Sequence, residues 1–553
     1  MYKTLTQSDS FVLRFENTVK ECWDNPAIDD YNISSLTYGE LAAAIEKIQL
    51  YWKAGGLKKG DKISINARSS SAWGQIFMAA ETGGYVAVQL FNGFTPKDTQ
   101  NLVNHSDSRL LYTEKKIFSG MNFEELPNLL AAIDLNTGEL LASRDGFGEI
   151  YEKRDSIIAQ AHPEGFRKED LHYDERALDD VCGINYTSGS TGNPKGVVYT
   201  ILNFSVNVYS IPFHLPDYRG DNYVSTLPFA HIFGLVYDLL GPLVIGMHLI
   251  ILGLPPIPAN LSPALCKYKP RGLFTVPLII MKMIDSTIGE FINSKSGKAK
   301  LADYENHEDY CKALRTIYTA AYGENMQLVV TGGAAFPAHI ENLMVNKLKA
   351  PFLTGYGMTE TAPSLAVGSP EDYKIGSCGK CISECVDFRV DSPDGENIPG
   401  ELLVKGQGVF KEYYKNPEAT KAAFTEDGWF RTGDMGKIDS EGNIFILGRC
   451  KNMILSANGQ NIYPEEIEVV LNAMNLVTES LIVSRQDKLV AIIVPDTEKA
   501  ANMSSEDLKS MMAENIKALN ARIPAYSQVS SFELHYEPFA KTPKGSIKRF
   551  MYE

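Results

Sequence analysis

The stretch Tyr186–Val197, YTSGSTGNPKGV, determines how the rest of this chain is interpreted. Hydroxyl side chains stand on both sides of Gly189, two more glycines follow at Gly192 and Gly196, and Lys195 comes directly after a proline. Glycines let a backbone approach a polyanion closely, hydroxyls add donors, and the lysine supplies a mobile positive charge. The preceding VCGINYT has the apolar pattern of a strand that runs into the loop. The stretch therefore predicts a phosphate-binding loop and not a flexible surface linker.

The loop differs from the G-x-x-x-x-G-K-[ST] pattern of P-loop proteins. Counted from Gly189, the second glycine would stand at Pro194, and Lys195 is followed by Gly196 where a magnesium-binding hydroxyl is required. The sequence therefore predicts a phosphate loop of another kind.

Length, composition and charge limit the possible functions. The chain has 553 residues, which suggests three or four folding units at roughly 150 residues each. With 44% apolar and 22% charged residues it has the composition of a globular protein. The formal charge of −15 argues against a nucleic-acid partner, because phosphate contacts need clustered Lys and Arg. An anionic ligand must therefore be held by a few local cations.

Three features bear on the location of the protein. The start, MYKTLTQSDSF, contains no apolar segment typical of a secretory signal. The most apolar stretch, 234–258, includes Asp238 and His248, so we expect a buried helix and strand there and no membrane span, which needs about 20 uninterrupted apolar residues. Eight cysteines without framework spacing fit a reducing compartment. We expect a cytoplasmic protein without an integral membrane segment.

The hydrophobic pattern predicts an α/β protein. From about residue 10 to 354, short apolar strands alternate with amphipathic helices, as in a largely parallel sheet covered by helices. Residues 116–175 are polar and weakly periodic, and we interpret them as a surface excursion. Between 376 and 448, β-prone runs separated by turn residues predict a small antiparallel sheet or barrel. After Arg449 the pattern indicates an αβ module of about 100 residues.

Downstream of the loop, Gly355–Thr361 (GYGMTET) follows a strand end, where α/β proteins place ligand contacts. Tyr356 offers a ring to stack on a base and Thr359 a hydroxyl for a phosphate. Glu360 offers a hard oxygen ligand for magnesium. Taken alone the stretch is a turn with a capping acid, but beside a phosphate loop it predicts part of a nucleotide site.

Two further stretches carry polar groups at the boundary between the β-rich and αβ segments. In 429–434 (WFRTGD), Asp434 could accept hydrogen bonds from both hydroxyls of a ribose. In 448–452 (GRCKN), Arg449 and Lys451 place two cations at a predicted hinge.

Together these stretches resemble the AMP-forming adenylating enzymes, the superfamily of acyl-CoA synthetases, luciferases and peptide-synthetase adenylation domains. The loop, GYGMTET and WFRTGD resemble family motifs in the family's order and spacing, as do Gly332-Gly333-Ala334 and GRCKNMILSANGQNIYPEEIE at 448–468. LPFAHIFG at 227–234 resembles another motif, whose histidine, here His231, lies near the acyl pocket. The likeness is closest to fatty acyl-CoA synthetases.

The resemblance implies an α/β fold in two domains. The large N-terminal domain, 1–449, would contain two mostly parallel, helix-covered sheets and a small β-barrel-like subdomain at about 376–448. A small mobile α+β C-terminal domain, 450–553, would follow.

The resemblance also implies an ATP- and Mg²⁺-dependent acid–thiol ligase. A carboxylate joins the α-phosphate of ATP with release of pyrophosphate, and the acyl group then passes to a thiol, usually that of coenzyme A. Because the attacked phosphorus is surrounded by negative charge, catalysis must come from positioning and charge neutralisation. A fatty acid is the leading substrate class, and activation of an aryl acid or loading of a carrier protein is the alternative.

The family's roles transfer position by position. The phosphates would be held by Thr187, Ser188, Gly189, Ser190, Thr191, Gly192 and Lys195, and magnesium by Glu360. The nucleoside would be bound by Gly333, Ala334, Tyr356, Gly357, Thr359, Asp434 and Arg449. Lys451 matches the hinge, Gly459 the thiol channel, and His231 and Gly332 the substrate pocket.

The C-terminal end departs from the family pattern. The family lysine that contacts the carboxylate and the α-phosphate lies in T-x-x-G-K-I-x-R, but residues 542–549 read TPKGSIKR and place Ser546 at that position. If the tail is extended, Lys544 and Lys548 lie on the same face as Ser546 and one of them would substitute. The alternatives are slow adenylation, or a homologue that binds nucleotide and acyl groups without turnover.

Overall fold

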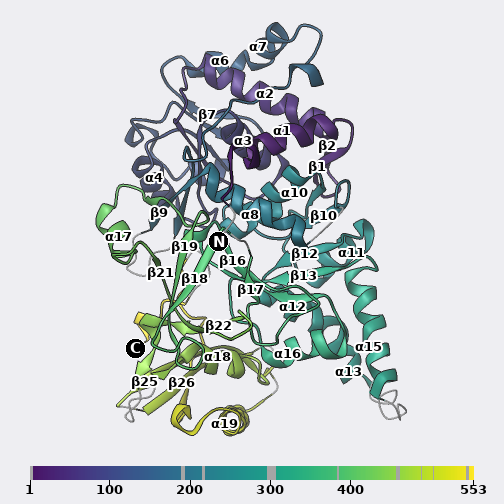
Figure 1. Ribbon diagram of the computed structural model, residues 1–553, viewed down its shortest axis with the longest axis vertical. Coiled ribbons are helices and arrows are strands. Elements are labelled where there is room, and N and C mark those ends of the chain that lie inside the picture. Colours follow the sequence, from purple (N-terminus) through teal and green to yellow (C-terminus); the bar gives the residue numbers. More distant parts are fainter. Residues whose placement is uncertain are drawn as a thin grey trace.

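The computed structural model describes residues 4–187, 194–214, 218–295, 307–382, 385–455, 461–486, 488–497, 499–501, 503–542 and 547–552. An eight-stranded sheet in the order β20-β9-β8-β4-β3-β5-β6-β7 forms the upper part of the molecule (Figure 1). Its centre, from β8 to β6, is parallel, and β7, β9 and β20 are antiparallel additions at the edges. The strands are β3 (Lys62–Asn66), β4 (Val86–Gln89), β5 (Ser108–Thr113), β6 (Ala131–Asp134), β7 (Leu140–Ser143), β8 (Val181–Thr187), β9 (Lys195–Thr200) and β20 (Glu412–Tyr413).

Helices α2 (Tyr38–Ala54) and α3 (Ser71–Thr82) belong to the βα alternation that the sequence predicts. The backbone N–H of Thr37 donates to Glu40 and the N–H of Glu40 donates to the Thr37 hydroxyl, so α2 begins with a reciprocal capping box. Both helices bury a tryptophan completely, Trp52 and Trp73.

The second parallel region consists of two adjoining sheets, β10-β11-β1-β2 and β12-β13-β14. The hydroxyl of Thr226, just after β10, donates to the carbonyl of Phe274 in β12 over 3.4 Å and links the two sheets. Together with the large sheet they confirm the predicted α/β fold class. The strands are β1 (Pro26–Asp30), β2 (Ser34–Thr37), β10 (Asn222–Ser225), β11 (His248–Ile251), β12 (Gly272–Thr275), β13 (Leu328–Thr331) and β14 (Phe352–Thr354). The helices include α8 (Ile201–His214), α11 (Pro258–Tyr268), α12 (Pro277–Ile284), α15 (His307–Tyr322) and α16 (Ala338–Asn342).

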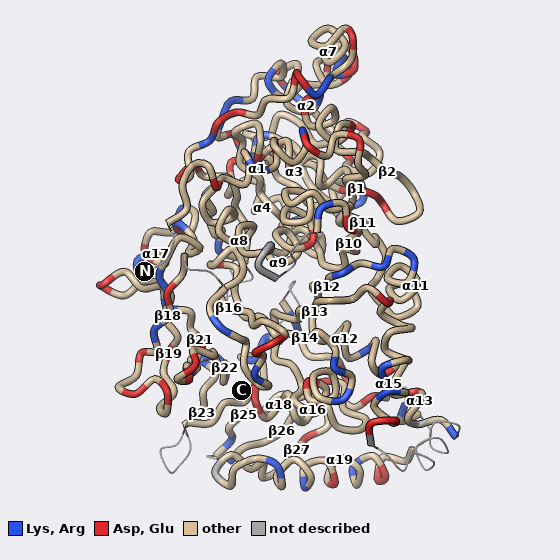
Figure 2. Tube along the Cα trace, turned by 45° about the vertical axis from the view of Figure 1, so that its right-hand side comes forward, with Lys and Arg blue, Asp and Glu red and all other residues tan. Residues whose placement is uncertain are grey.

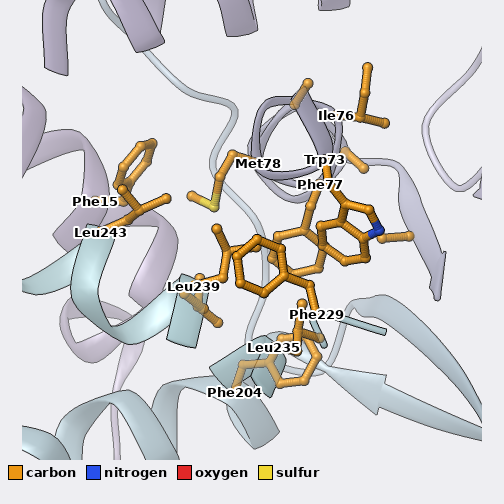
Figure 3. Close-up of a cluster of buried hydrophobic side chains, with 14 of the residues drawn as sticks. Phe15, Trp73, Ile76, Phe77, Met78, Phe204, Phe229, Leu235, Leu239 and Leu243 are labelled. Carbon is orange, nitrogen blue, oxygen red and sulfur yellow. The ribbon is translucent and has the colours of Figure 1, made fainter. Parts of the chain in front are cut away.

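An aromatic and aliphatic cluster joins the two regions (Figure 3). Trp73 and Phe77 point from α3 toward Phe229, and the Trp73 and Phe229 ring centroids lie 5.5 Å apart at an edge-to-face angle of 63°. All three side chains are fully buried. Complete burial of a large apolar side chain stabilises the fold by about 1.5–3 kcal/mol. This cluster therefore stabilises the packing of the large sheet's region against the second parallel region.

The apolar stretch 234–258 is buried as predicted over most of its length, but Leu254 and Ile257 near its end are exposed. It comprises the end of α9 (Ile232–Leu235), a π-helical turn (Val236–Leu240), α10 (Gly241–Ile245) and β11. In the described part of the chain no helix is long and apolar enough to cross a membrane.

The interpretation of 116–175 as a surface excursion is wrong for part of this segment. β6 (Ala131–Asp134) lies in the large sheet beside β5 and is buried along its whole length. A strand of four residues that begins with two alanines has no measurable period and weak β-propensity, so its neighbours and not its own pattern place it.

The predicted β-rich segment is present as a four-stranded antiparallel sheet of β18 (Val386–Asp391), β19 (Gly400–Gly406), β21 (Phe430–Ile438) and β22 (Ile444–Arg449). A second small sheet contains β15 (Tyr356–Gly357), β16 (Ser364–Val367) and β17 (Lys380–Cys381).

The αβ module lies at the bottom of Figure 1, with its own apolar core between helices and sheet. The module contains α18 (Pro464–Asn472), β25 (Val477–Arg485), β26 (Lys488–Pro495), α19 (Ser505–Asn520) and β27 (Ser531–Leu534). Figure 2 shows acidic and basic residues alternating along its outer helix α19.

Candidate functional site

The signature loop connects two antiparallel strands. Thr187, the last residue of β8, pairs with Lys195, the first residue of β9, and the Thr187 hydroxyl donates to the Lys195 carbonyl over 3.4 Å. The signature loop is thus followed by a strand, whereas the loop of a P-loop protein is followed by a helix. Ser188, Gly189, Ser190, Thr191 and Gly192 lie outside the described residues.

Lys195 faces an aromatic ring from a distant part of the chain. Its Nζ lies 4.8 Å from the centroid of Tyr413, close enough for a cation–π interaction. β20 carries Tyr413 and pairs with β9, with Tyr413 opposite Val197. The next backbone N–H, that of Tyr414, donates to the carbonyl of Gly196 over 2.7 Å. This edge pairing fixes the ring against the lysine.

Tyr413 also reaches Glu360. The phenolic hydroxyl donates to Oε1 of Glu360 over 2.8 Å, and burial together with the negative charge of Glu360 raises the pKa of Tyr413. The tyrosine therefore remains a proton donor. Two hydrogen bonds fix the backbone at Glu360. The N–H of Phe410 donates to the carbonyl of Glu360, and the hydroxyl of Tyr199 donates to the carbonyl of Thr359.

Asp434 lies between two donors. Tyr356 donates to its Oδ2 over 2.7 Å and Arg449 donates to its Oδ1 over 2.6 Å. The carboxylate is buried and the arginine is partly exposed. Burial and the neighbouring Asp434 raise the pKa of Tyr356. Burial by itself lowers the pKa of Arg449, but the carboxylate of Asp434 outweighs this effect, so that the net shift is upward.

The group Lys195–Tyr413–Glu360 and the group Tyr356–Asp434–Arg449 influence each other electrostatically. The negative charge of Glu360 contributes to the raised pKa of Arg449. The positive charge of Arg449 partly offsets the upward shift that burial causes in the pKa of Tyr413. The structure therefore gathers Lys195, Glu360, Asp434 and Arg449, which the sequence singled out, into one polar region.

The glycine motif lies at the carboxyl ends of β13 and β14. A Cβ on Gly332 would come within 3.2 Å of the Gly355 carbonyl, so the two strand ends approach closely. Gly333 has φ +81°, a conformation that favours glycine, and Ala334 follows it as an exposed residue. Gly357 is equally constrained, because a Cβ there would lie 2.0 Å from the carbonyl oxygen of Pro363.

His231 lies at the N-terminus of α9 and is half-buried, with its ring edge-to-face with Phe91 at 6.0 Å. Two residues on, the ring of Phe233 lies 3.8 Å from the Cβ position of Gly332. The two motifs predicted for the substrate pocket are therefore neighbours in the fold.

The C-terminal positions are only partly described. Gly459, Lys544 and Ser546 lie outside the described residues. Lys451 is exposed in the turn after β22. The backbone N–H of Lys548 donates to the carbonyl of Ala540 within the αβ module, and no hydrogen bond or ion pair among the described residues joins the Lys548 side chain to Glu360 or Lys195.

Tyr413 and Tyr199 are not among the site residues that the sequence predicts. The pair Tyr413-Tyr414 in the polar run KEYYKN is a weak signal for a functional aromatic side chain. Tyr199 is fully buried in β9, and its sequence environment does not distinguish it from a core residue.

Comparisons with known proteins agree with this arrangement. Residues 15–414 match the AMP-binding enzyme family and residues 451–553 match the AMP-binding enzyme C-terminal domain. The chain is 28% identical to long-chain-fatty-acid–CoA ligase 1 of Saccharomyces cerevisiae, covering 87% of this chain and 74% of the relative. It is 26% identical to long-chain-fatty-acid–CoA ligase FadD15 of Mycobacterium bovis, covering 93% and 90%.

Among solved structures, ATP-bound MatB from Rhodopseudomonas palustris has the same fold, with a TM-score of 0.75, 22% identity and 98% of both chains covered. These findings confirm the predicted resemblance and the enzyme class, an AMP-forming acid–CoA ligase. The chain belongs to the AMP-binding enzyme family.

Proposed function

We propose that this protein activates a fatty acid with ATP and Mg²⁺ and transfers the acyl group to coenzyme A. The observation that carries the proposal is the meeting of two polar groups, Lys195–Tyr413–Glu360 and Tyr356–Asp434–Arg449. One offers a cation and a carboxylate for a metal–phosphate unit, and the other offers acceptors for a ribose. The names of the two curated relatives support the choice of a fatty acid.

In the first half-reaction a carboxylate oxygen of the acid attacks the α-phosphorus of ATP. The bond from that phosphorus to the bridging oxygen breaks, and pyrophosphate leaves with the electron pair. Lys195 would neutralise phosphate charge as the nucleophile approaches, and its contact with Tyr413 keeps the ammonium group in place. Charge neutralisation by preorganised groups is the main protein contribution in such phosphorus chemistry.

Asp434 would orient the nucleoside. Each carboxylate oxygen accepts one bond in the described structure and has a further acceptor position, so the carboxylate can still receive both ribose hydroxyls. Tyr356 and Gly333 would flank the adenine, with Ala334 and Gly357 beside them. Thr187 and Thr359, with the undescribed loop residues 188–192, would contact the phosphates.

Glu360 fits a magnesium site. Its Oε1 accepts the hydrogen bond of Tyr413, whereas Oε2 accepts none from the described residues. Magnesium is bound through one or two carboxylates together with waters and substrate phosphates, so a single available oxygen suffices. When bound, the ion would supply positive charge to the phosphates.

In the second half-reaction the thiol sulfur of coenzyme A attacks the acyl carbonyl and AMP leaves. We propose that residues 450–553 form a domain that turns about Lys451 between the two steps, with Gly459 lining the thiol channel. Two observations support a boundary after Arg449. β22 ends there, and Asn452 donates to Glu465 over 2.5 Å across the first turn of the following module.

We further propose that Lys544 or Lys548 supplies the charge missing at Ser546, and that the protein works in the cytoplasm. The acyl chain would lie beside His231 and Gly332. The proximity of Phe233 to Gly332 supports an apolar wall at the pocket.

The test is pyrophosphate release from MgATP with short, medium, long and aryl carboxylic acids, each with and without coenzyme A. Release with long-chain acids that rises with coenzyme A supports the proposal. Release with aryl acids alone would replace the substrate. No release with any acid, together with retained ATP binding, would favour a homologue that binds without turnover.

A further inference from the structure

A cavity of about 220 Å³ lies in the N-terminal part of the fold. Its walls come from α2 and α3, from β5 and β6, and from the segment containing α6 (Phe147–Glu152) and α7 (Arg154–Ala161). In the large sheet, β5 is separated from β8, the strand that leads into the signature loop, by β4 and β3. Three strand spacings correspond to about 14 Å, so the cavity is separate from the candidate nucleotide site.

The cavity has an apolar lining on several sides. Figure 3 shows that Ile76 points away from the cluster of Trp73, Phe77 and Phe229, which places it on the other side of α3. The apolar residues at the cavity are Ala44, Ile48, Ala72, Ile76, Ile133 and Leu135.

Two buried tyrosines at the cavity leave one hydrogen-bond donor unused. Tyr51 is 3% exposed and Tyr112 is 2% exposed, and both line the cavity. Their hydroxyls lie 2.7 Å apart, and the indole N–H of Trp52 donates to Tyr112 over 2.8 Å. The three groups carry three polar hydrogens and form two hydrogen bonds. Whichever tyrosine donates to the other, one phenolic hydrogen has no acceptor among the described residues.

Three charged side chains, those of Lys47, Asp134 and Arg154, also line the cavity. Arg154 lies 4.3 Å from the ring centroid of Tyr151 and donates to its carbonyl, and it makes no ion pair with a described carboxylate. Lys47 is paired with Asp155. The carboxylate of Asp134 already accepts hydrogen bonds from the backbone of Lys115 and from residues 136 and 137. Among the described lining residues, the donors without a printed acceptor are thus one phenolic hydrogen, the amide of Gln75 and N–H groups of the Arg154 guanidinium.

We propose that this cavity is a second ligand site, which binds a molecule with one aromatic ring and a carbonyl or carboxylate oxygen. The unpaired phenolic hydrogen would donate to that oxygen, and the aliphatic side chains would contact the ring. The size fits, since an apolar cavity of about 150 Å³ holds benzene. Arg154 would favour a carboxylate over a neutral carbonyl.

The test uses ¹⁹F NMR titration of the full-length protein with 4-fluorobenzamide, 4-fluorobenzoate and 4-fluorotoluene. The amide cannot be adenylated, and the Ala44 and Ala43 variants described below distinguish its binding at this cavity from binding in the acyl pocket. We expect saturable binding of the amide and the acid, and roughly five-fold weaker binding of fluorotoluene, which lacks the acceptor. Tighter binding of the benzoate would identify an acid as the ligand, and tighter binding of the benzamide a neutral carbonyl; both outcomes support the site.

Two neighbouring alanines of α2 provide a matched pair of variants. Ala44 lines the cavity and Ala43 does not. Ala44→Leu fills part of the space and is expected to weaken amide binding at least ten-fold, whereas Ala43→Leu leaves it unchanged. Equal binding by the two variants, equal binding of all three probes, or no binding of the amide at millimolar concentration would overturn the proposal and leave a cavity that holds water only.

Discussion

The hydroxyl of Tyr413 donates to the carboxylate of Glu360 over 2.8 Å, while its ring lies 4.8 Å from the ammonium group of Lys195. Tyr413 follows Glu360 by 53 residues in the chain, and the sequence separation between Tyr413 and Lys195 is larger still. One side chain thus connects the lysine of the signature loop with the proposed magnesium ligand.

Tyr413→Phe keeps the ring beside Lys195 and removes the hydrogen bond to Glu360. Because a hydrogen bond to a charged group contributes about 1.5–3 kcal/mol, we expect a fall of roughly ten-fold or more in kcat for pyrophosphate release. Tyr413→Leu removes both contacts and should be slower still. The exposed Tyr536 serves as control, and Tyr536→Phe should behave like the wild type. Equal rates for wild type and Tyr413→Phe would contradict a role for this bond.

The pair Asp434–Arg449 should act as one unit in nucleotide binding. Asp434→Asn removes the negative charge that pairs with the guanidinium of Arg449. Arg449→Met removes the positive charge that pairs with the buried carboxylate of Asp434. We expect each variant to raise the KM for ATP about ten-fold or more, and the double variant to raise it by less than the product of the two effects. Steady-state kinetics measure all three values.

The exposed pair Arg389–Asp427 in the same β-rich segment supplies the control. Arg389→Met and Asp427→Asn should leave the KM for ATP unchanged. Multiplicative effects at Asp434 and Arg449 would show that the two residues act independently.

One tail lysine should be needed for adenylation. We expect the alanine variant of the lysine that substitutes, Lys544→Ala or Lys548→Ala, to slow pyrophosphate release, the double variant to slow it at least about ten-fold, and Ser546→Lys to accelerate it, because the α-phosphate requires a positive charge. Lys509→Ala, on the exposed side of α19, is the control. Unchanged rates in both single variants and in the double variant would rule out substitution by either lysine.

Glu81 should make stability depend on pH. It is completely buried in α3, and burial raises its pKa to about 8, against the opposing effects of Arg176 and Cys182. Since the folded state holds this proton more tightly than the unfolded state, its contribution to stability is greatest below about pH 4.5 and is lost as the pH rises toward 8.

Glu81→Gln keeps the neutral shape and removes the titration. The fall in Tm between pH 5 and pH 8 should therefore be smaller in this variant than in the wild type. Glu152→Gln, on the exposed surface of α6, should show the wild-type dependence. A Glu81→Gln curve parallel to that of the wild type would show that Glu81 is ionised throughout this range.

The local features of this protein follow from short stretches of sequence. The capping box of Thr37 and Glu40 forms as predicted, since its partners are three residues apart. The strand before the signature loop and the parallel strands β12 to β14 also lie where the apolar pattern places them. The residue types of the candidate nucleotide site can also be read from the sequence, because glycines, hydroxyls and charged residues occur together at fixed spacing in the motifs.

Only the tertiary structure decided which distant groups meet. β20 adds to the open edge of β9 and so brings Tyr413 to Lys195, and Tyr356 reaches Asp434 across 78 residues. The burial of β6 and the leftover donor of Tyr51 and Tyr112 likewise depend on neighbours far away in the chain. The periodicity of a segment shows which of its side chains face the interior, but it does not show which other segment they contact. The partner of a strand edge or of a buried hydroxyl depends on which groups the whole fold leaves available.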